Sequence, residues 1–239
     1  MSALQENRRV LLERFAGRLF EQQPQSVLDV GCGEGGLLRM AAGRDIRACG
    51  VDVSAARVER LQQDGLDAEE ASATSLPRPD RSVDWVAVRH VLHHLEEPGD
   101  ALREAWRVAR RGLLVAEPWN DASLPSQQAM SRVDAFLRRH ENAHGHVHEP
   151  YLSAAQILAH LPADAGVGPV ESLVLLRRLT VEDFDAEVEH ASEGIDLSRE
   201  DRSELAFLRK EVLAGRVTMS GSVLVLARKD APADQSSST

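Results

Sequence analysis

The 239-residue sequence predicts an α/β fold with a doubly wound, mostly parallel sheet, an antiparallel edge strand and helices on both faces. Short β-branched segments alternate with amphipathic helical segments through the first half of the chain, which is the pattern of βαβ units. The first of these segments leads into four glycines within residues 31–36, and a helical segment follows. This order is typical of ligand-binding turns in doubly wound sheets. The strand-like segments 170–179 and 222–228 are predicted to form the antiparallel edge.

Five short segments are predicted to form the parallel part of the sheet. The first, 26–30, is β-branched and bounded by turn residues, which suits a buried strand. Ser54 is the predicted N-cap of a helix that ends at Gly65. Asp100 is the predicted N-cap of a helix over 101–111. The expected strands are 26–30, 46–53, 67–71, 83–88 and 112–116, and the other expected helices of this half are 6–20 and 37–42.

Residues 117–162 break the alternation and are predicted to form loops and two helices. The second of these helices, 154–161, begins at a capping box made by Ser153 and Gln156. We expect this segment and the N-terminal helix 6–20 to cover the sheet edge where doubly wound folds bind ligands. The expected organisation is a single domain over 1–230, which includes two acidic helices over 181–215, and a disordered tail over 231–239.

Composition narrows the class of partner. The sequence has 28 Lys plus Arg against 38 Asp plus Glu, a formal net charge of −10, and no run of basic residues. Proteins that bind bulk nucleic acid usually carry such a run, so we expect no bulk nucleic acid as partner. The chain has no apolar leader and no apolar stretch long enough to cross a membrane, which favours a cytoplasmic protein without a membrane partner. Cys32 and Cys49 form no Cys-x-x-Cys pair and are predicted to be buried thiols. The oligomeric state is left open.

The glycine loop, residues 31–36, indicates a nucleotide-like cofactor. Its glycines fit the dinucleotide fingerprint. Asp52 follows about 20 residues later, at a strand end, where a carboxylate can bind ribose hydroxyls. Asp29, two residues before the first glycine, would repel a pyrophosphate but attract the sulfonium and ammonium groups of S-adenosylmethionine. Alternatively, Asp29 only caps backbone amides of the turn.

Three motifs occur in order between residues 26 and 118. They are Val-Leu-Asp-Val-Gly-Cys-Gly-Glu-Gly at 27–35, Gly-Val-Asp-Val-Ser at 50–54, and Val-Asp-Trp-Val-Ala-Val-Arg-His-Val-Leu-His-His-Leu at 83–95. With these motifs the sequence resembles the class I S-adenosylmethionine-dependent methyltransferases, particularly the small-molecule branch that includes quinone-biosynthesis methyltransferases. The resemblance implies a Rossmann-like fold, S-adenosylmethionine as cofactor and a small molecule as methyl acceptor. It ends near Pro118, so it identifies neither the acceptor nor the acceptor atom.

The same resemblance implies the contacts of the cofactor. The glycine loop would hold the methionine end, Asp52 the ribose hydroxyls, and the backbone near Arg89 the amino-acid moiety. The family often has Asp, facing the adenine amino group, where this chain has Ser72. A hydroxyl can accept that hydrogen bond, though more weakly than a carboxylate. The predicted set of cofactor contacts is Asp29, Gly31, Cys32, Gly33, Asp52, Val53, Ser72, Ala73 and Arg89.

Methyl transfer needs an acceptor held in line with the reacting bond and, when the acceptor is protonated, a base. His90 and His94 follow the fourth predicted strand, at the ligand-binding edge, and are the preferred pocket-lining pair. Glu117 follows the fifth strand as a candidate base, and Trp119 as a candidate pocket wall. Alternatively, His93 and His94 only cap a helix or pack under the sheet, Glu117 pairs with an arginine and Trp119 fills a gap.

A histidine-rich segment, 140–150, supplies further candidates. His140 and His144 have the His-Glu-x-x-His spacing of zinc proteases. Gly145 follows His144 directly, and a zinc protease function would leave the glycine loop unexplained. We therefore predict no metal ligand in this segment. A metal site and a solvated loop stay as alternatives. His146 and His148 are the preferred pocket bases, because alternate side chains of an extended chain point the same way. The predicted catalytic set is His94, Glu117, His146 and His148.

Two other functions stay open. An NAD(P)-dependent oxidoreductase is favoured by the glycine pattern but opposed by Asp29 and by the motif at 83–95. A non-catalytic protein could bind the cofactor, or only a protein partner, and use its acidic helices as an interaction surface.

Overall fold

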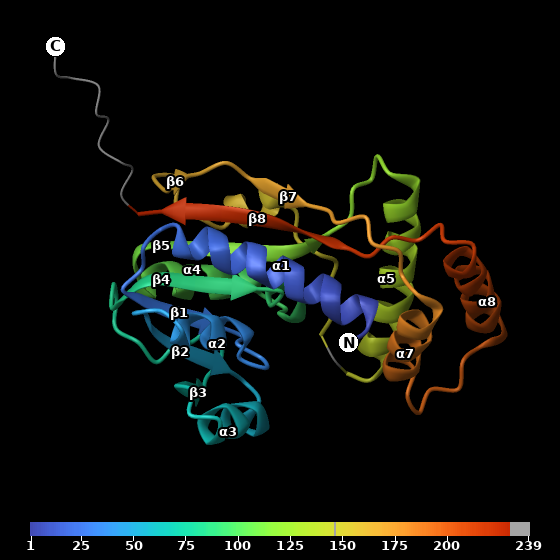
Figure 1. The fold of residues 1–239 in the computed structure, drawn as a ribbon, viewed down its shortest axis with the longest axis horizontal. Coiled ribbons are helices and arrows are strands. Elements are labelled where there is room, and N and C mark those ends of the chain that lie inside the picture. Colours follow the sequence, from blue (N-terminus) through green and yellow to red (C-terminus); the bar gives the residue numbers. More distant parts are fainter. Residues whose placement is uncertain (146, 230–239) are drawn as a thin grey trace, which may run out of the picture.

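A computed structural model describes residues 1–145 and 147–229 of the chain (Figure 1). One sheet carries eight strands in the order β3-β2-β1-β4-β5-β8-β6, and β7 also pairs with β8. The strands are β1 (Ser26–Val30), β2 (Arg47–Asp52), β3 (Ala68–Glu70), β4 (Val83–Arg89), β5 (Ala109–Trp119), β6 (Gly166–Val167), β7 (Glu171–Leu173) and β8 (Gly221–Arg228). The helices are α1 (Ala3–Phe20), α2 (Gly36–Ala42), α3 (Ala55–Gln63), α4 (Pro98–Val108), α5 (Pro125–Ala143), α6 (Ala154–Ala159), α7 (Val181–Ala191) and α8 (Arg199–Leu213), with a 3-10 turn, η1 (Leu92–His94).

The sheet confirms the predicted fold class. Strands β1 to β5 are parallel, and β8 runs antiparallel to β5, β6 and β7. The antiparallel strand β8 is not the edge, however, because β6 and β7 pair along its outer side. The predicted strand 170–179 is confirmed only over 171–173, and the predicted tail 231–239 lies outside the described residues.

Both faces of the sheet are covered by helices, as successive side chains of β4 show. Trp85 and Ala87 pack on one face with Phe15 of α1 and Leu37 of α2. Val86 and Val88 pack on the other face with apolar side chains of α4 and α6. In Figure 1, α1 crosses in front of the sheet and α4 lies behind it. Because side chains alternate along a strand, a continuous apolar segment such as β4 must be buried on both sides.

A second apolar cluster lies beyond the end of the sheet and joins three helices. Phe136 of α5, Phe184 of α7 and Leu208 of α8 are buried in it together. Figure 1 shows these helices gathered at one end of the molecule. The two acidic helices therefore bury their apolar faces against α5.

The local signals at helix starts were right at two places and wrong at one. Ser54 caps α3, and Ser153 with Gln156 forms the predicted capping box of α6. The helix predicted over 101–111 is α4, which begins at Pro98 and ends at Val108, so Asp100 lies inside its first turn instead of capping it. The fixed φ of proline favours the first turn of a helix, which accounts for the earlier start.

Within the two described ranges, no helix combines the length and the apolarity needed to cross a bilayer. The cytoplasmic location stays a prediction.

Candidate active site

A cavity of about 930 Å³ opens at the carboxyl ends of β1, β2 and β4. Its walls come from α1, the glycine loop, the chain after β2 and β3, η1, α7, and the residues Glu141, Val147 and His148. In doubly wound sheets, ligands bind at this edge, where the strand order reverses. The topology therefore brings segments far apart in sequence to one site.

The glycine loop is fixed against the end of β2. The amides of Gly31 and Cys32 both donate to the carbonyl of Val51, at 2.8 and 3.0 Å. Gly31 has a φ of +68°, and a Cβ there would lie 2.3 Å from Cγ2 of Val91. Only glycine fits both the backbone angle and the space.

Asp52 connects this loop to the end of β2. Its buried carboxylate accepts hydrogen bonds from the amides of Gly33 at 2.9 Å and Ser54 at 3.0 Å. Each bond uses a different oxygen, and a carboxylate can accept about four hydrogen bonds, so capacity is left for ligand hydroxyls. The next residue, Val53, is 70% exposed although apolar, and it lines the cavity.

Asp29 and Arg89 form a charged couple at the ends of neighbouring strands. Arg89 lines the cavity, and burial lowers the pKa of its guanidinium while Asp29 raises it. Burial raises the pKa of Asp29 to about 7; Arg89 opposes this rise and Asp52 adds to it. The positive charge of Arg89 does not fully balance the buried carboxylate of Asp29. Such a carboxylate favours a cationic ligand group beside it.

Ser72 is placed differently from its predicted neighbours. Ala71 and Ala73 line the cavity. The Ser72 hydroxyl bonds instead with the hydroxyl of Thr74, at 2.8 Å, and accepts from the Thr74 amide at 3.2 Å. Its contact with adenine stays a prediction.

Glu117 lies beneath η1. Its side chain is completely buried, and it accepts from Nδ1 of His93 at 2.7 Å and from the amides of Val91 and Leu92 at 3.2 Å each. The carboxylate thus fixes the turn that presents His94 to the cavity. We infer a positioning role for Glu117, in place of the predicted role as base.

The predicted pair His90 and His94 both line the cavity. His90 has a φ of +56°, and its Nε2 lies 3.0 Å from the Ser222 hydroxyl. Burial lowers the pKa of His90 well below the ordinary value, and that of His94 to a lesser degree.

His148 reaches the same wall from the chain after α5. Its ring centroid lies 5.0 Å from that of His94, and its Nδ1 bonds to the Glu141 carboxylate. Both Glu141 and His148 line the cavity. The sequence did not indicate Glu141, since the pair meets only because the chain turns back at Gly145, and His146 lies outside the described residues.

His140 is turned away from this cavity. Its Nδ1 donates to the carbonyl of Phe136 at 2.8 Å, and its Nε2 lies 3.6 Å from Asp201 of α8. Among the residues that the structure describes, no three His, Cys, Asp or Glu side chains are grouped to hold a metal ion. His140, the first residue of the His-Glu-x-x-His spacing, therefore contributes to the packing of α5 against α8.

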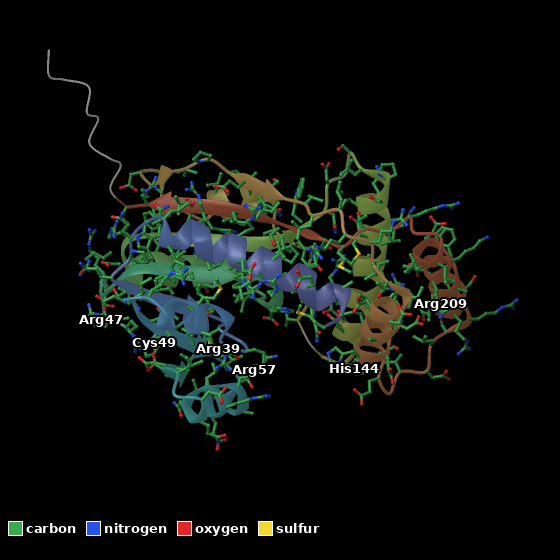
Figure 2. All side chains as sticks on the ribbon, in the orientation of Figure 1. Arg39, Arg47, Cys49, Arg57, His144 and Arg209 are labelled. Carbon is green, nitrogen blue, oxygen red and sulfur yellow. The ribbon has the colours of Figure 1, made fainter. Side chains whose placement is uncertain are left out.

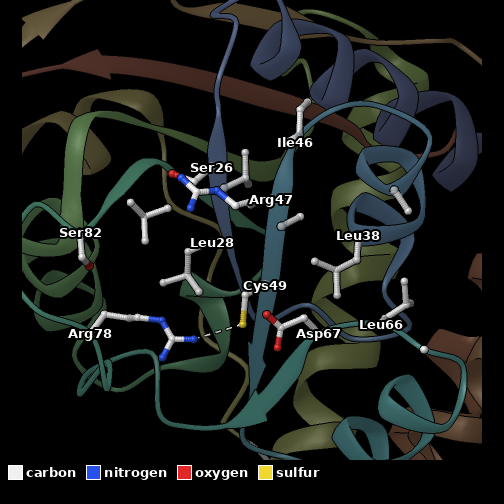
Figure 3. Close-up of a pocket in the computed structure, with 15 residues that line it drawn as sticks. Ser26, Leu28, Leu38, Ile46, Arg47, Cys49, Leu66, Asp67, Arg78 and Ser82 are labelled. Carbon is white, nitrogen blue, oxygen red and sulfur yellow. Dashed lines mark hydrogen bonds between the residues drawn. The ribbon is translucent and has the colours of Figure 1, made fainter.

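A second cavity, of about 570 Å³, lies at the amino ends of β1, β2 and β4 (Figure 3). Cys49 lines it, and Arg78 donates to its sulfur at 3.2 Å. Burial raises the pKa of this thiol to about 11, so it is not a nucleophile at neutral pH. Figure 2 shows Arg47 and Cys49 toward one end of the sheet and Arg57, a residue of the larger cavity, toward the other.

Comparison with known proteins identifies a methyltransferase domain in this chain. Residues 28–116 match the family model described as a methyltransferase domain. The 27-O-demethylrifamycin SV methyltransferase of Amycolatopsis mediterranei (strain S699) is 35% identical over 120 residues, 46% of this chain and 44% of that protein. Ajmaline N-methyltransferase of Rauvolfia serpentina is 29% identical over 156 residues, 60% and 54% of the two chains. This chain thus spans about half the length of these relatives. Among solved structures, the YcgJ protein of Bacillus subtilis is 18% identical, with a TM-score of 0.64 over 92% of this chain and 100% of that one.

The sheet, the glycine loop and the acidic residue at the end of β2 define a Rossmann-like protein that binds a nucleotide-like cofactor. Residues 28–116 match a methyltransferase domain, which confirms for this part of the chain the resemblance that the three motifs indicate. The predicted fold is confirmed as well, and S-adenosylmethionine is the cofactor of the methyltransferases that this part of the chain resembles.

Proposed function

We propose that this protein transfers a methyl group from S-adenosylmethionine to a small-molecule acceptor by in-line displacement. The observation that carries the proposal is one continuous cavity with a cofactor end and an acceptor end. The glycine loop, Asp52 and Arg89 form the first end, and His94 and His148 form the second. S-Adenosylmethionine supplies an activated methyl group when bound, so the protein's task is to hold the two reactants in line.

The charges of the cofactor end suit this ligand. Arg89 would hold the carboxylate of the methionine moiety and Asp29 its ammonium group. The free lone pairs of Asp52 would accept from the ribose hydroxyls, and the exposed Val53 would pack against the adenine. A dinucleotide would instead bring a pyrophosphate toward the buried Asp29 carboxylate, where both charges are negative.

In our proposal, α1 and part of 117–162 cover the acceptor end. Gln5, Arg8 and Leu12 of α1 line the cavity together with Glu141, Val147 and His148. The two relatives named above are called O- and N-methyltransferases of natural products, which supports a small organic acceptor here. These walls would exclude water and hold the acceptor nucleophile on the line of transfer.

The proposal is tested by incubating the protein with isotopically labelled S-adenosylmethionine and a library of small hydroxyl and amine compounds. We expect one chemical class to gain the label, and S-adenosylhomocysteine to form in equal amount. Tight binding of the cofactor without label transfer to any compound would instead support a non-catalytic binding protein.

Replacing Val53 by Asp should weaken S-adenosylhomocysteine binding about tenfold, because the substitution removes an apolar surface of the adenine site and adds a buried charge when ligand is bound. Isothermal calorimetry measures this change. Val167 is the matched control, since it is also an exposed valine, 46% exposed, but on β6. Equal dissociation constants for wild type, Val53→Asp and Val167→Asp would remove Val53 from the cofactor site.

A further inference from the structure

Two imidazoles on the acceptor wall have tautomers fixed by their partners. Nδ1 of His148 bonds to the carboxylate of Glu141, and Nδ1 of His94 lies 3.2 Å from the carbonyl oxygen of Val147. Carboxylates and carbonyls only accept hydrogen bonds, so in each neutral ring Nδ1 carries the proton. Nε2 of each ring is then left as an acceptor.

Nε2 of His148 is buried and has no hydrogen-bond partner among the described residues. The side chain is only 12% exposed, although the residue lines the cavity. An unpaired buried acceptor is costly, and such groups are rare unless a ligand or water completes them. The structure thus requires a hydrogen-bond donor at this point of the acceptor site.

The neighbourhood of His148 differs from that of His94 in one respect that matters for proton transfer. Glu141 is an anion and can stabilise the imidazolium that forms when Nε2 gains a proton, whereas the Val147 carbonyl is neutral. The hydrogen bond from His148 holds the pKa of the Glu141 carboxyl below its ordinary value, so the carboxylate stays ionised. Asn142 also fixes the backbone of His148, by accepting from its amide at 2.7 Å and donating to its carbonyl at 3.0 Å.

We propose that the methyl acceptor is an aryl or enolic hydroxyl, that His148 removes its proton, and that Glu141 is the residue that positions His148. This inference rests on the proposed function. The hydroxyl oxygen forms a bond to the methyl carbon while the carbon–sulfur bond breaks, and its electron pair stays on sulfur. The hydroxyl proton moves to Nε2 of His148 and then to solvent, so the products are the methyl ether, S-adenosylhomocysteine and one proton.

The acidity of the acceptor group and the charge of the cavity walls indicate the class of acceptor. A base assists best when its proton affinity is close to that of the group it deprotonates, and an imidazole matches an aryl or enolic hydroxyl far better than an alcohol. A protonated amine suits the acceptor end less well, because α1 brings the guanidinium groups of Arg8 and Arg9 to the cavity. The carboxylate of Glu141, on the other wall, is already bonded to His148.

The experiment uses catechol as acceptor and veratrole, the same ring with both hydroxyls methylated, as the blocked control. Transfer of labelled methyl is measured for wild type, His148→Gln and Glu141→Ala, with two controls: His160→Gln, at an exposed histidine, and Glu149→Ala, at an exposed glutamate. We expect label on catechol and none on veratrole. His148→Gln should lower kcat at least a hundredfold and Glu141→Ala about tenfold, with KM and the affinity for S-adenosylhomocysteine within threefold. Both controls should stay within twofold.

A spectroscopic readout separates positioning from folding. In the complex with S-adenosylhomocysteine, the ¹⁵N shifts of His148 should show a protonated Nδ1 and a bare Nε2, and Glu141→Ala should convert this to a mixture of tautomers while Glu149→Ala does not. Unchanged tautomers or an unchanged kcat in Glu141→Ala would overturn the positioning role of Glu141. Full activity of His148→Gln would overturn the role of His148 as the base. If S-adenosylhomocysteine binds but catechol gains no label, the hydroxyl class is rejected. If S-adenosylhomocysteine does not bind, the proposed function itself fails.

Discussion

Replacing Asp29 with Asn should stabilise the unliganded protein and weaken its affinity for S-adenosylhomocysteine, two effects that oppose each other. Burial raises the pKa of Asp29 from 3.8 to about 7, so keeping this carboxylate ionised in the folded protein at pH 8 opposes folding. With about 1.4 kcal/mol per pKa unit, removing the charge is worth at most ~4 kcal/mol, or at most roughly 8–16 °C in Tm for a chain of this length. The Asn variant also loses the partner of the cofactor's ammonium group.

The pH dependence of both effects follows from the same shift. The folded state holds a proton on Asp29 that the unfolded state releases, so the stability of wild type falls as pH rises from about 4 to 7 and this loss is complete above 7. The stability gain of Asp29→Asn should therefore grow over that range and then level off. The affinity of wild type should fall as pH drops below 7, because the protonated carboxyl no longer attracts a cation, and that of the variant should not.

Thermal unfolding and calorimetry between pH 5.5 and 7.5 measure the two effects, with Asp45→Asn, at an exposed aspartate, as control. A variant less stable than wild type when unliganded would contradict the account of Asp29 burial. An affinity equal to that of wild type would contradict its place beside the ammonium group.

Replacing Asp52 with Ala should weaken binding of S-adenosylhomocysteine at least a hundredfold. Two bonds from ribose hydroxyls to a carboxylate contribute about 1.5–3 kcal/mol each. The variant also removes the acceptor of the Gly33 and Ser54 amides, so the glycine loop loses its attachment to the end of β2. Calorimetry measures the first effect, and faster hydrogen exchange of the Gly33 amide reports the second.

Glu59→Ala is the control for Asp52→Ala, because Glu59 is an exposed carboxylate on the neighbouring helix α3. Asp52→Asn separates the two effects, since the amide keeps one acceptor oxygen and removes the charge. A dissociation constant for Asp52→Ala within threefold of wild type would rule out the ribose assignment.

The sequence was most informative where function depends on a few consecutive residues. The end of β1, the glycine loop and Asp52 were all predicted, because a tight turn between a buried strand and a helix requires glycines at fixed places. The start of β5 at Ala109 was missed, since the apolar pattern of α4 continues into the strand and marks no boundary. Proline at position 98, not the carboxylate at 100, decided where α4 begins.

Contacts between distant segments could not be predicted in this way. Glu117 was expected at the ligand-binding edge, and it does end up there, but the direction of its side chain depends on how η1 folds over β5. Likewise, Glu141 meets His148 only through the turn at Gly145, a contact across seven residues that no helical or strand period produces. The packing of α7 and α8 on α5 depends on matching apolar faces, for which a single sequence gives no pairing signal.

We propose that the cavity at the carboxyl ends of β1, β2 and β4 binds S-adenosylmethionine. Isothermal calorimetry of the wild-type protein with S-adenosylmethionine, S-adenosylhomocysteine, NADH and NADPH tests it most directly, because no acceptor is needed. We expect saturable binding of both adenosyl ligands at one site per chain, and no binding of either nicotinamide cofactor. Binding of a nicotinamide cofactor without binding of the adenosyl ligands would contradict it.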